Sequence, residues 1–527
     1  MTVVSSRVIL KERTAVEVQL DPLTRKYFLR LEPPSLSNNQ ADTDRLQDAL
    51  QTVAGRVTVP LPLMREVGDI CREKEWCVTA TVGPRGEGLR LLALEPGDTT
   101  ARHFGLAVDI GTTTVVVYLI DMASGEVLGS AADYNGQVSY GEDILTRIYL
   151  AATDDGLKRM QEAVLGTLNN LIGGMEKKFG VAAREIGAVV VGVNSTMVHL
   201  LLGLDPSRIC REPYTPIVNN PGMLMAGEVG LTVNPLAVLY CIPGIGSYVG
   251  GDVIAGVLVS GMHRNKEISL LVDIGTNGEM VVGNEDWLVA CAGAAGPALE
   301  GGVAQAGMRA EPGAVETVSI EPGTFKVHYS TVGGGPPRGI CGSGLIDCLA
   351  ELFLTGIIDR SGYFRDGRSY FTIVPASKSA SGEEIVVSQM DINNFMRTKG
   401  AVNAALETLL EGVGVGLAEL DRFYAAGAFG QYLNLESSIT IGLYPDLPRE
   451  KMIKLGNSSG EGARLVLLSN QKRLEVEETA RRITYFELNA NQQFMNKFIS
   501  SKFLPHTNLD FFPSVKAKLA ERGLLEK

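Results

Sequence analysis

The hydrophobic pattern of this chain repeats at two places. Residues 106–121 read LAVDIGTTTVVVYLID, and residues 270–285 read LLVDIGTNGEMVVGNE. In both segments an apolar run rich in β-branched residues is followed by Asp, a Gly-Thr corner and a second apolar run. Two such runs separated by a short turn predict two adjacent strands joined by a tight corner. The repeat indicates two related half-sites that hold one nucleotide between two lobes.

The residues at both corners have the chemistry of a phosphate site. Glycine lets the backbone approach a phosphate closely, and the N–H and hydroxyl groups that follow donate to its oxygens. Asp109 and Asp273 end the first strand of each repeat, where a carboxylate can hold Mg²⁺ through water. Both are therefore assigned catalytic and metal-binding roles, although an aspartate there can also simply cap its own turn. The predicted phosphate-binding residues are Gly111, Thr112, Thr113, Gly275, Thr276 and Asn277.

Outside the repeat, the chain alternates between strand and helix periodicity, which predicts a mixed α/β architecture. Residues 1–100 are predicted to form a small α/β domain, with residues 95–103 as a polar linker. The two copies of the repeat then open domains at 101–265 and 266–527. In the first domain we predict strands at 14–18, 27–31, 56–60, 76–83 and 89–94, and helices at 42–53 and 63–74. In the others we predict helices at 141–152, 157–179 and 402–420, strands at 186–193 and 422–430, and a glycine-rich turn entering a buried helix at 247–262.

Composition and charge narrow the function classes. The formal net charge of −12 argues against nucleic acid or an anionic membrane as the main partner. No secretory segment is apparent, and the longest uncharged stretch, 229–251, is interrupted by prolines and glycines, so we expect a cytoplasmic protein without a membrane span. The seven cysteines have no CxxC spacing. We expect core thiols rather than an iron–sulfur or zinc site in this chain.

Two further glycine-rich segments are candidates for nucleotide contacts. The amides of Gly342, Ser343 and Gly344 precede an amphipathic segment, where a helix N-terminus can face a phosphate; a purely structural loop explains them equally well. A second set follows a predicted strand, and its small side chains admit an adenine or a ribose. These residues are Ala426, Gly427, Ala428, Phe429 and Gly430.

Candidate acids and bases are fewer. Glu279 and Glu300 are each placed to orient a water molecule, and each is equally well explained as one half of an ion pair. His199 lies on an apolar segment and is expected to pack in the core. The GNSSG segment at 456–460 is the one GxSxG match, but polar residues continue after it, so we predict a turn rather than a nucleophile elbow. Zinc-peptidase and P-loop patterns are absent from the sequence.

Several longer segments resemble one family. The two DIGT corners, followed by AAGAFG at 425–430, are similar to the actin, sugar-kinase and Hsp70 superfamily, and within it to the reductive activators of corrinoid proteins. The segments that carry the narrower resemblance are YNGQVSYGEDILTRI (134–148), GNEDWLVACAGAAGPALEGG (283–302), RGICGSGLIDCLAELFLTGIID (338–359), YAAGAFGQYL (424–433), IGLYPDLP (441–448), LGN…GA (455–463) and HTNLDFFPSV (506–515).

The resemblance implies a fold, an activity and roles for residues. The fold is a pair of duplicated actin-like, Hsp70-like or sugar-kinase-like lobes, with the α/β architecture of ribonuclease H, after a small α/β domain. The activity is the ATP-dependent return of an inactive Co(II) corrinoid protein to Co(I) for methyl transfer. ATP would favour a conformation that alters cobalt coordination and raises its potential toward that of a cellular donor. By motif, Asp109 and Asp273 serve Mg²⁺-ATP, both corners and Gly342–Gly344 serve its phosphates, and Ala426–Gly430 serve the nucleoside.

The chain departs from the family at its start. Members typically begin with a ferredoxin-like domain that holds a 2Fe-2S cluster, whereas this sequence starts within VSSRVILK, where that domain would end. The cysteines lack ligand spacing, so either the cluster domain has been removed from this chain or electrons come from a separate ferredoxin-type donor. The other expected partner is the corrinoid protein of a methyltransferase system, and a homodimer is a family expectation.

Three alternatives remain open at this point. The first is an activator of 2-hydroxyacyl-CoA dehydratases, although the contexts of Cys291 and Cys341 match that family poorly. The second is a carbohydrate or acid kinase, for which no substrate motif is apparent. The third is a nucleotide-dependent module that docks on and remodels a corrinoid protein without transferring electrons itself.

Overall fold

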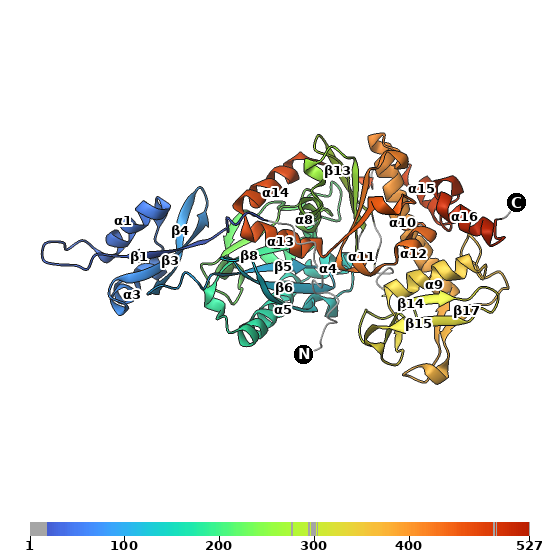
Figure 1. Cartoon of the computed structure of the whole chain (residues 1–527), viewed down its shortest axis with the longest axis horizontal. Helices are drawn as coiled ribbons and strands as arrows, with labels where there is room; N and C mark the ends of the chain where they lie inside the picture. Colours follow the sequence, from blue (N-terminus) through green and yellow to red (C-terminus); the bar gives the residue numbers. More distant parts are fainter. Residues whose placement is uncertain are drawn as a thin grey trace.

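A computed structural model describes residues 18–275, 278–293, 296, 302, 304–488, 491 and 493–525. Figure 1 shows the small N-terminal module at one end of the molecule and the part that contains α9, β14 and β15 at the other. Two larger sheets lie between these ends. The strand predicted at 14–18, apart from its last residue, lies outside the described residues, as do Thr276, Asn277 and Glu300.

The small module is a four-stranded sheet covered by helices, with strand order β1-β3-β4-β2. Leu46 and Leu50 lie one helical turn apart on α1 and are fully buried against the sheet. The prediction of one helix at 63–74 is wrong, because the chain forms two helices there. They are separated by a turn at Arg65 and Glu66, where the Glu66 N–H donates to Leu63 O. The elements are β1 (Arg25–Arg30), α1 (Asp42–Ala54), β2 (Val57–Thr58), α2 (Leu61–Met64), α3 (Val67–Glu73), β3 (Cys77–Arg85) and β4 (Gly88–Pro96).

The two central sheets share the topology of five strands and differ in the place of the sixth, β9 or β21. The first has the order β7-β6-β5-β8-β10-β9 and the second β20-β19-β11-β12-β13-β21. In each sheet the central strand, β5 or β11, is antiparallel to the strand that follows it and parallel to a later strand, β8 or β19. Their strands are β5 (Phe104–Ile110), β6 (Thr114–Asp121), β7 (Val127–Tyr134), β8 (Ile186–Val193), β9 (Met223–Met225), β10 (Val238–Cys241), β11 (Ser269–Ile274), β12 (Gly278–Gly283), β13 (Leu288–Gly293), β19 (Arg422–Ala426), β20 (Met452–Gly456) and β21 (Ile483–Tyr485).

Two equivalent helices join the sheets. Helix α8 (Gly251–Ser260) follows β10, and α13 (Ser458–Leu468) follows β20. Helix α13 packs on β5 and β8 of the first sheet, whereas α8 packs on β11 and β12 of the second, so each sheet is covered by a helix from the other half. The two helices also pack on each other so closely that a Cβ on Gly462 would lie 2.5 Å from Ala255 Cβ. Both helices are therefore apolar on most sides.

Helices of the first half cover the outer face of its sheet, where α5 contacts β6 and β7. The predicted helices at 141–152 and 157–179 and the strand at 186–193 correspond to α4, α5 and β8. The helices of this half are α4 (Ile144–Ala151), α5 (Gly156–Phe179), α6 (Ser195–Leu202) and α7 (Ala226–Val229).

The second half carries an insertion and a C-terminal extension. Two predictions need correction here. The helix predicted at 402–420 is α10, which in fact starts at Gln389 and ends before Gly414, whose φ is +70°. The early start was missed because the first half of α10 is polar and shows no hydrophobic periodicity. The strand predicted at 422–430 stops at Ala426. The remaining elements are β14 (Ala314–Ile320), β15 (Val327–Thr331), β16 (Gly339–Ile340), α9 (Gly342–Leu354), β17 (Tyr370–Val374), β18 (Ile385–Ser388), α10 (Gln389–Val413), α11 (Ala428–Tyr432), α12 (Leu435–Thr440), α14 (Asn470–Arg482), α15 (Phe494–Ser501) and α16 (Pro513–Glu521).

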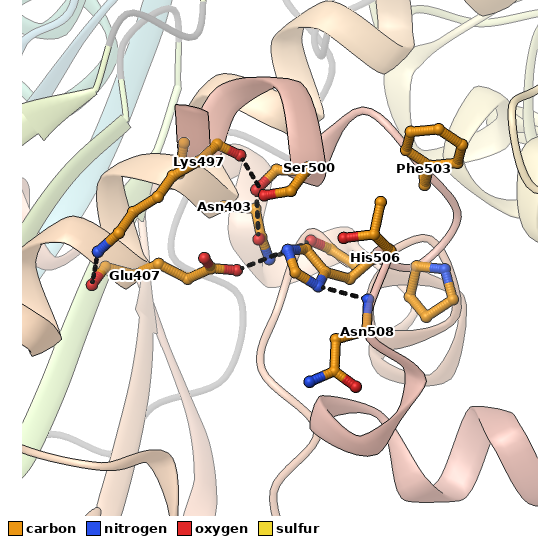
Figure 2. A network of polar contacts seen from close by, with 12 residues as sticks. Asn403, Glu407, Lys497, Ser500, Phe503, His506 and Asn508 are labelled. Atoms are coloured by element: carbon orange, nitrogen blue, oxygen red, sulfur yellow. Dashed lines mark hydrogen bonds and ion pairs between the residues drawn. The ribbon is translucent and has the colours of Figure 1, made fainter. Parts of the chain in front are cut away.

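The C-terminal extension is fixed to α10 by buried polar contacts. Lys399 of α10 is fully buried, and its ammonium donates to the carbonyl oxygens of Ser501, Phe503 and Pro505. Figure 2 shows the contacts one and two turns further along α10, where Glu407 Oε1 lies 3.0 Å from His506 Nε2. The segment that contains HTNLDFFPSV is thus held to the body of the second half.

Candidate functional site

Asp109 and Asp273 occupy equivalent positions in the two sheets. Each is the next-to-last residue of its central strand, β5 or β11. A third carboxylate, that of Asp252, lies in the first turn of α8, the helix between the sheets. All three side chains are partly buried, and their charges interact, because Asp109 and Asp252 both raise the pKa of Asp273. The structure thus brings the two predicted aspartates together and adds Asp252 to them.

The electrostatics of this cluster favour a cation. Burial raises the pKa of Asp109 to about 6, although the nearby Ser459 hydroxyl and Asn457 side chain oppose the shift. Burial, then the charges of Asp252 and Asp109, raise the pKa of Asp273 to about 8. Burial also raises the pKa of Asp252, and the Asp109 charge adds to this shift. Three like charges in one place destabilise each other, and a divalent cation would remove that repulsion.

The donor set fits Mg²⁺ held through water. In the described part of the chain, no three His, Cys, Asp or Glu side chains are close enough to bind one metal ion directly. Mg²⁺ usually keeps several of its waters and takes its remaining ligands from carboxylates and substrate phosphates. Carboxylates grouped at this looser spacing, beside two phosphate-type corners, suit a hydrated ion bound with a nucleotide.

The first corner is held by asparagine side chains. The Gly111 N–H donates to Thr114 O at 2.9 Å, which closes the turn between β5 and β6. The buried Asn135 amide donates to Gly111 O at 3.0 Å. Asn194, which caps α6, donates to Thr112 Oγ1 at 3.4 Å. Gly111, Thr112 and Thr113 therefore form a supported corner directly after Asp109.

The second corner is described except for Thr276 and Asn277, which lie outside the described residues. Asp273 pairs directly with Glu279 across β11 and β12, so both side chains lie on the same face of the sheet. Glu279 is 6% exposed, and its charge contributes to the raised pKa values of Cys291 and Tyr485. Its proposed role as a base stays a prediction.

The segment 426–430 begins beside Asp273. Ala426 pairs with Asp273 in the parallel ladder of β11 and β19. Gly427 has φ +88°, and a Cβ there would lie 2.5 Å from Asp273 Oδ1. Only glycine therefore fits at this point, where the chain turns into α11. The backbone of Ala428 and Phe429 lies in α11, and a Cβ on Gly430 would lie 3.5 Å from the Tyr444 hydroxyl.

Gly342, Ser343 and Gly344 form the first turn of α9, as expected for a helix N-terminus. Their described contacts are with β14: Ser343 Oγ donates to Glu316 O at 3.0 Å, and Gly344 lies tightly against Val315 O. These contacts explain why small residues are needed there. The phosphate role of this turn stays a prediction.

Sequence reasoning missed Asp252, Asn457 and Ser459. The GNSSG segment is a turn between elements as predicted, but the polar residues after it do not continue a loop, because β20 ends at Gly456 and the helix α13 starts at Ser458. Its Ser459 lies so close to the first sheet that Gly192 has no room for a side chain. One signal was available for Asp252, which is a single charge at the start of an otherwise apolar helix. For Ser459 the long-range contact left no local signal.

The prediction for His199 is confirmed. The side chain is fully buried, its Nδ1 donates to Ser195 O at 2.6 Å and its Nε2 accepts from the Ile217 N–H at 2.9 Å. The cysteines are free thiols: Cys71, Cys241, Cys291, Cys341 and Cys348 are buried, and Cys77 and Cys210 are partly buried. Burial raises the pKa of Cys71 to about 11, and it raises the pKa values of Cys241, Cys291 and Cys348 as well. No helix in the described ranges is long and apolar enough to cross a membrane.

Comparisons with known proteins agree with this architecture. Three family models match successive parts of the chain: the RACo linker region at 13–101, the RACo middle region at 104–265 and the C-terminal ASKHA domain of RACo at 267–516. The corrinoid activation enzyme RamQ of Eubacterium limosum is 34% identical over 432 residues, which cover 78% of this chain and 72% of that protein.

Two further proteins are similar over most of their length. The Co(II) methylated amine-specific corrinoid protein reductase of Methanosarcina barkeri is 25% identical over 417 residues, which cover 72% of this chain and 73% of that protein. A solved structure of a reductive activator for corrinoid, iron-sulfur protein has 44% identity and a TM-score of 0.88, over 95% of this chain and 82% of that one. The predicted fold, duplicated lobes after a small α/β domain, is confirmed, and the chain belongs to the RACo family of reductive activators of corrinoid proteins.

Proposed function

We propose that this protein uses ATP to reactivate a corrinoid protein, returning its cobalt from Co(II) to Co(I) for methyl transfer. Membership of the family supports the reaction. The observation that carries the nucleotide part is the cluster of Asp109, Asp252 and Asp273 between two equivalent sheets, each with its own glycine-threonine corner. An energy-dependent conformational step fits a site that is divided between two lobes.

The residues have distinct proposed roles. Mg²⁺ bound with ATP supplies the charge neutralisation that three buried carboxylates need. Asp109, Asp252 and Asp273 orient its water ligands, and the two corners donate to the phosphates. Gly342–Gly344 complete the phosphate site, and the segment 426–430 holds the nucleoside. Glu279, on the same face as Asp273, is the proposed base.

The reduction needs one electron for each cobalt, and we propose a ferredoxin-type protein as its source. The chain's thiols suit packing rather than electron transfer, since burial keeps several of them protonated. A homodimer and a cytoplasmic location are also part of the proposal. Light scattering on the purified protein tests the first of these.

The central experiment mixes the protein with a Co(II) corrinoid protein of a methyltransferase system, Mg-ATP and a low-potential reductant, and follows the corrinoid absorbance. ATP-dependent growth of the Co(I) band supports the proposal. Asp273→Asn should abolish that growth, while Asp366→Asn, at an exposed site paired with Arg368, should leave it unchanged. An ATP-sensitive shift of the Co(II) spectrum without Co(I) would instead indicate a docking and remodelling module. ATP hydrolysis without any spectral change would contradict the activator function.

A further inference from the structure

Arg147 is a buried charge without a matching carboxylate contact. It lies on α4, and its side chain is fully buried. Nε donates to Gly141 O at 2.8 Å and Nη1 to Gln137 Oε1 at 3.2 Å, whereas Nη2 has no partner among the described residues. Asp143 interacts with Arg147 through charge alone, because its carboxylate accepts from the N–H and hydroxyl of Thr146.

A chain of buried hydrogen bonds connects this guanidinium to the first corner. Gln137, which accepts from Arg147, donates its own N–H to Asn135 Oδ1 at 3.1 Å. The Asn135 side-chain amide donates to Gly111 O at 3.0 Å, and the backbone N–H of Asn135 donates to Thr113 O at 2.9 Å. Arg147 therefore supports the backbone that presents the donors of this corner.

The charge is also close to the corner in space. Arg147 Nη1 and Asn135 Nδ2 contact the same sulfur atom, that of Met197, at 3.5 and 3.7 Å. Along this path the guanidinium lies within about 10 Å of Gly111 O. At that distance the electrostatic interaction between two charges in a protein interior is still substantial.

The charges around Arg147 have both signs: Asp143 favours its protonated form, whereas a helix N-terminus and a second arginine add positive potential. Met197 lies in the first turn of α6, whose N-terminal end carries a partial positive charge. Arg309 of the second half opposes the protonation of Arg147, and its guanidinium packs 4.3 Å from the centre of the Tyr134 ring. Glu311 accepts from the hydroxyl of the same tyrosine.

A buried guanidinium that contacts no carboxylate and has one nitrogen without a hydrogen-bond partner is destabilising, and a nearby anion would reduce that cost. We propose that Arg147 is a positioning residue for the nucleotide phosphates: it holds the Gly111–Thr113 corner through Gln137 and Asn135, and its charge stabilises the phosphate oxyanions from behind that corner. It does so without touching the nucleotide. The inference rests on the proposed nucleotide site and goes beyond it, because it assigns a long-range electrostatic role to a residue outside both corners.

The test compares charge states of the ligand and of the side chain. Binding of ATP, ADP and AMP is measured by calorimetry for the wild-type protein, Arg147→Met and Arg147→Lys. One charge at about 10 Å in a protein environment changes the dissociation constant of an anionic ligand on the order of tenfold, and the effect grows with the ligand's charge. Arg147→Met should therefore weaken ATP binding by roughly tenfold or more and AMP binding much less. Arg147→Lys, which keeps the charge, should preserve the ratio of ATP to AMP affinity.

A matched control separates this role from packing. Arg45 is a buried arginine of the small module that also has an unpaired nitrogen, and Arg45→Met should leave all three affinities unchanged. The melting temperature of each nucleotide-free variant shows whether it is folded, and affinities are compared only between folded variants.

Two results would overturn the inference: equal losses for ATP, ADP and AMP, or an Arg147→Lys variant as impaired as Arg147→Met. If Arg147→Met does not fold, the Lys variant and Arg309→Gln decide the question, and the latter should lower ATP affinity more than AMP affinity. A wild-type protein that binds no ATP would reject the proposed function itself, which is a distinguishable outcome.

Discussion

Replacing Asp273 by Asn should make the nucleotide-free protein more stable at pH 8. The raised pKa of Asp273 means that the folded state prefers the neutral carboxyl, so its contribution to stability is complete below pH 4 and is lost as the pH rises through about 8. A shift from 3.8 to about 8 corresponds to an upper bound of about 6 kcal/mol at 1.36 kcal/mol per unit. Desolvation of the Asn amide and the partial hydration of the carboxylate reduce the expected gain to about 2 kcal/mol.

The assay is thermal unfolding at pH 5 and pH 8, with and without Mg-ATP. Without nucleotide, Asp273→Asn should raise the melting temperature by a few degrees at pH 8 and change it little at pH 5, where Asp273 is already protonated. With Mg-ATP the order should reverse, because only the wild type gains stability from the ligand. A variant that is less stable than the wild type at pH 8, or equally changed at both pH values, would refute the reasoning. Asp366→Asn, at an ion-paired surface site, should show no gain at either pH.

Three further predictions follow from the same contacts. Gly427→Ala should prevent Mg-ATP binding in calorimetry, since a positive φ costs about 1–2 kcal/mol for alanine and its Cβ would displace the Asp273 carboxylate; Gly414→Ala, also at a positive φ but with no atom within 4 Å of the added Cβ, should bind normally. Lys399→Met should leave three carbonyl groups without their donor, at a cost of about 3 kcal/mol, and limited proteolysis should then cut residues 494–521 faster than in the wild type. Chelation of Mg²⁺ in the presence of ATP should restore the steep loss of stability between pH 5 and 8, whereas an unchanged pH profile would mean that the ion does not neutralise the carboxylates.

The parts of the site that could be predicted from the sequence are those that the chain contains twice. Asp109 and Asp273 stand out because the same apolar run and corner surround both, and the structure places them in equivalent strands. The sequence predicts only that a small residue is needed at Gly427. That a Cβ there would clash with Asp273 could not be predicted, because it depends on a parallel ladder between strands that are far apart in the chain. The local sequence pattern therefore identified the two corners, but not the residues that long-range contacts bring next to them.

The errors have related causes. Helix α13 packs on the first sheet, on α8 and on α14, so its small and polar first turn, which suggests a loop, is in fact the surface that permits close packing. Asp252 was not predicted as a site residue because it lies outside the two repeated segments. The first half of α10 was missed because residues such as Lys399 are buried by binding carbonyl groups rather than by being apolar, which hydrophobic periodicity cannot detect.

The exchange of α8 and α13 between the sheets makes the two halves interdependent. A chain cut between residues 265 and 266 would leave α8 on one fragment and α13, β11 and β12, on which it packs, on the other; α13 would be separated from β5 and β8 in the same way. Neither fragment could bury its own apolar helix. The fragments should therefore behave as complementary pieces that acquire structure only when they meet, and the protein offers a natural split point for a reporter whose reassembly restores a nucleotide site.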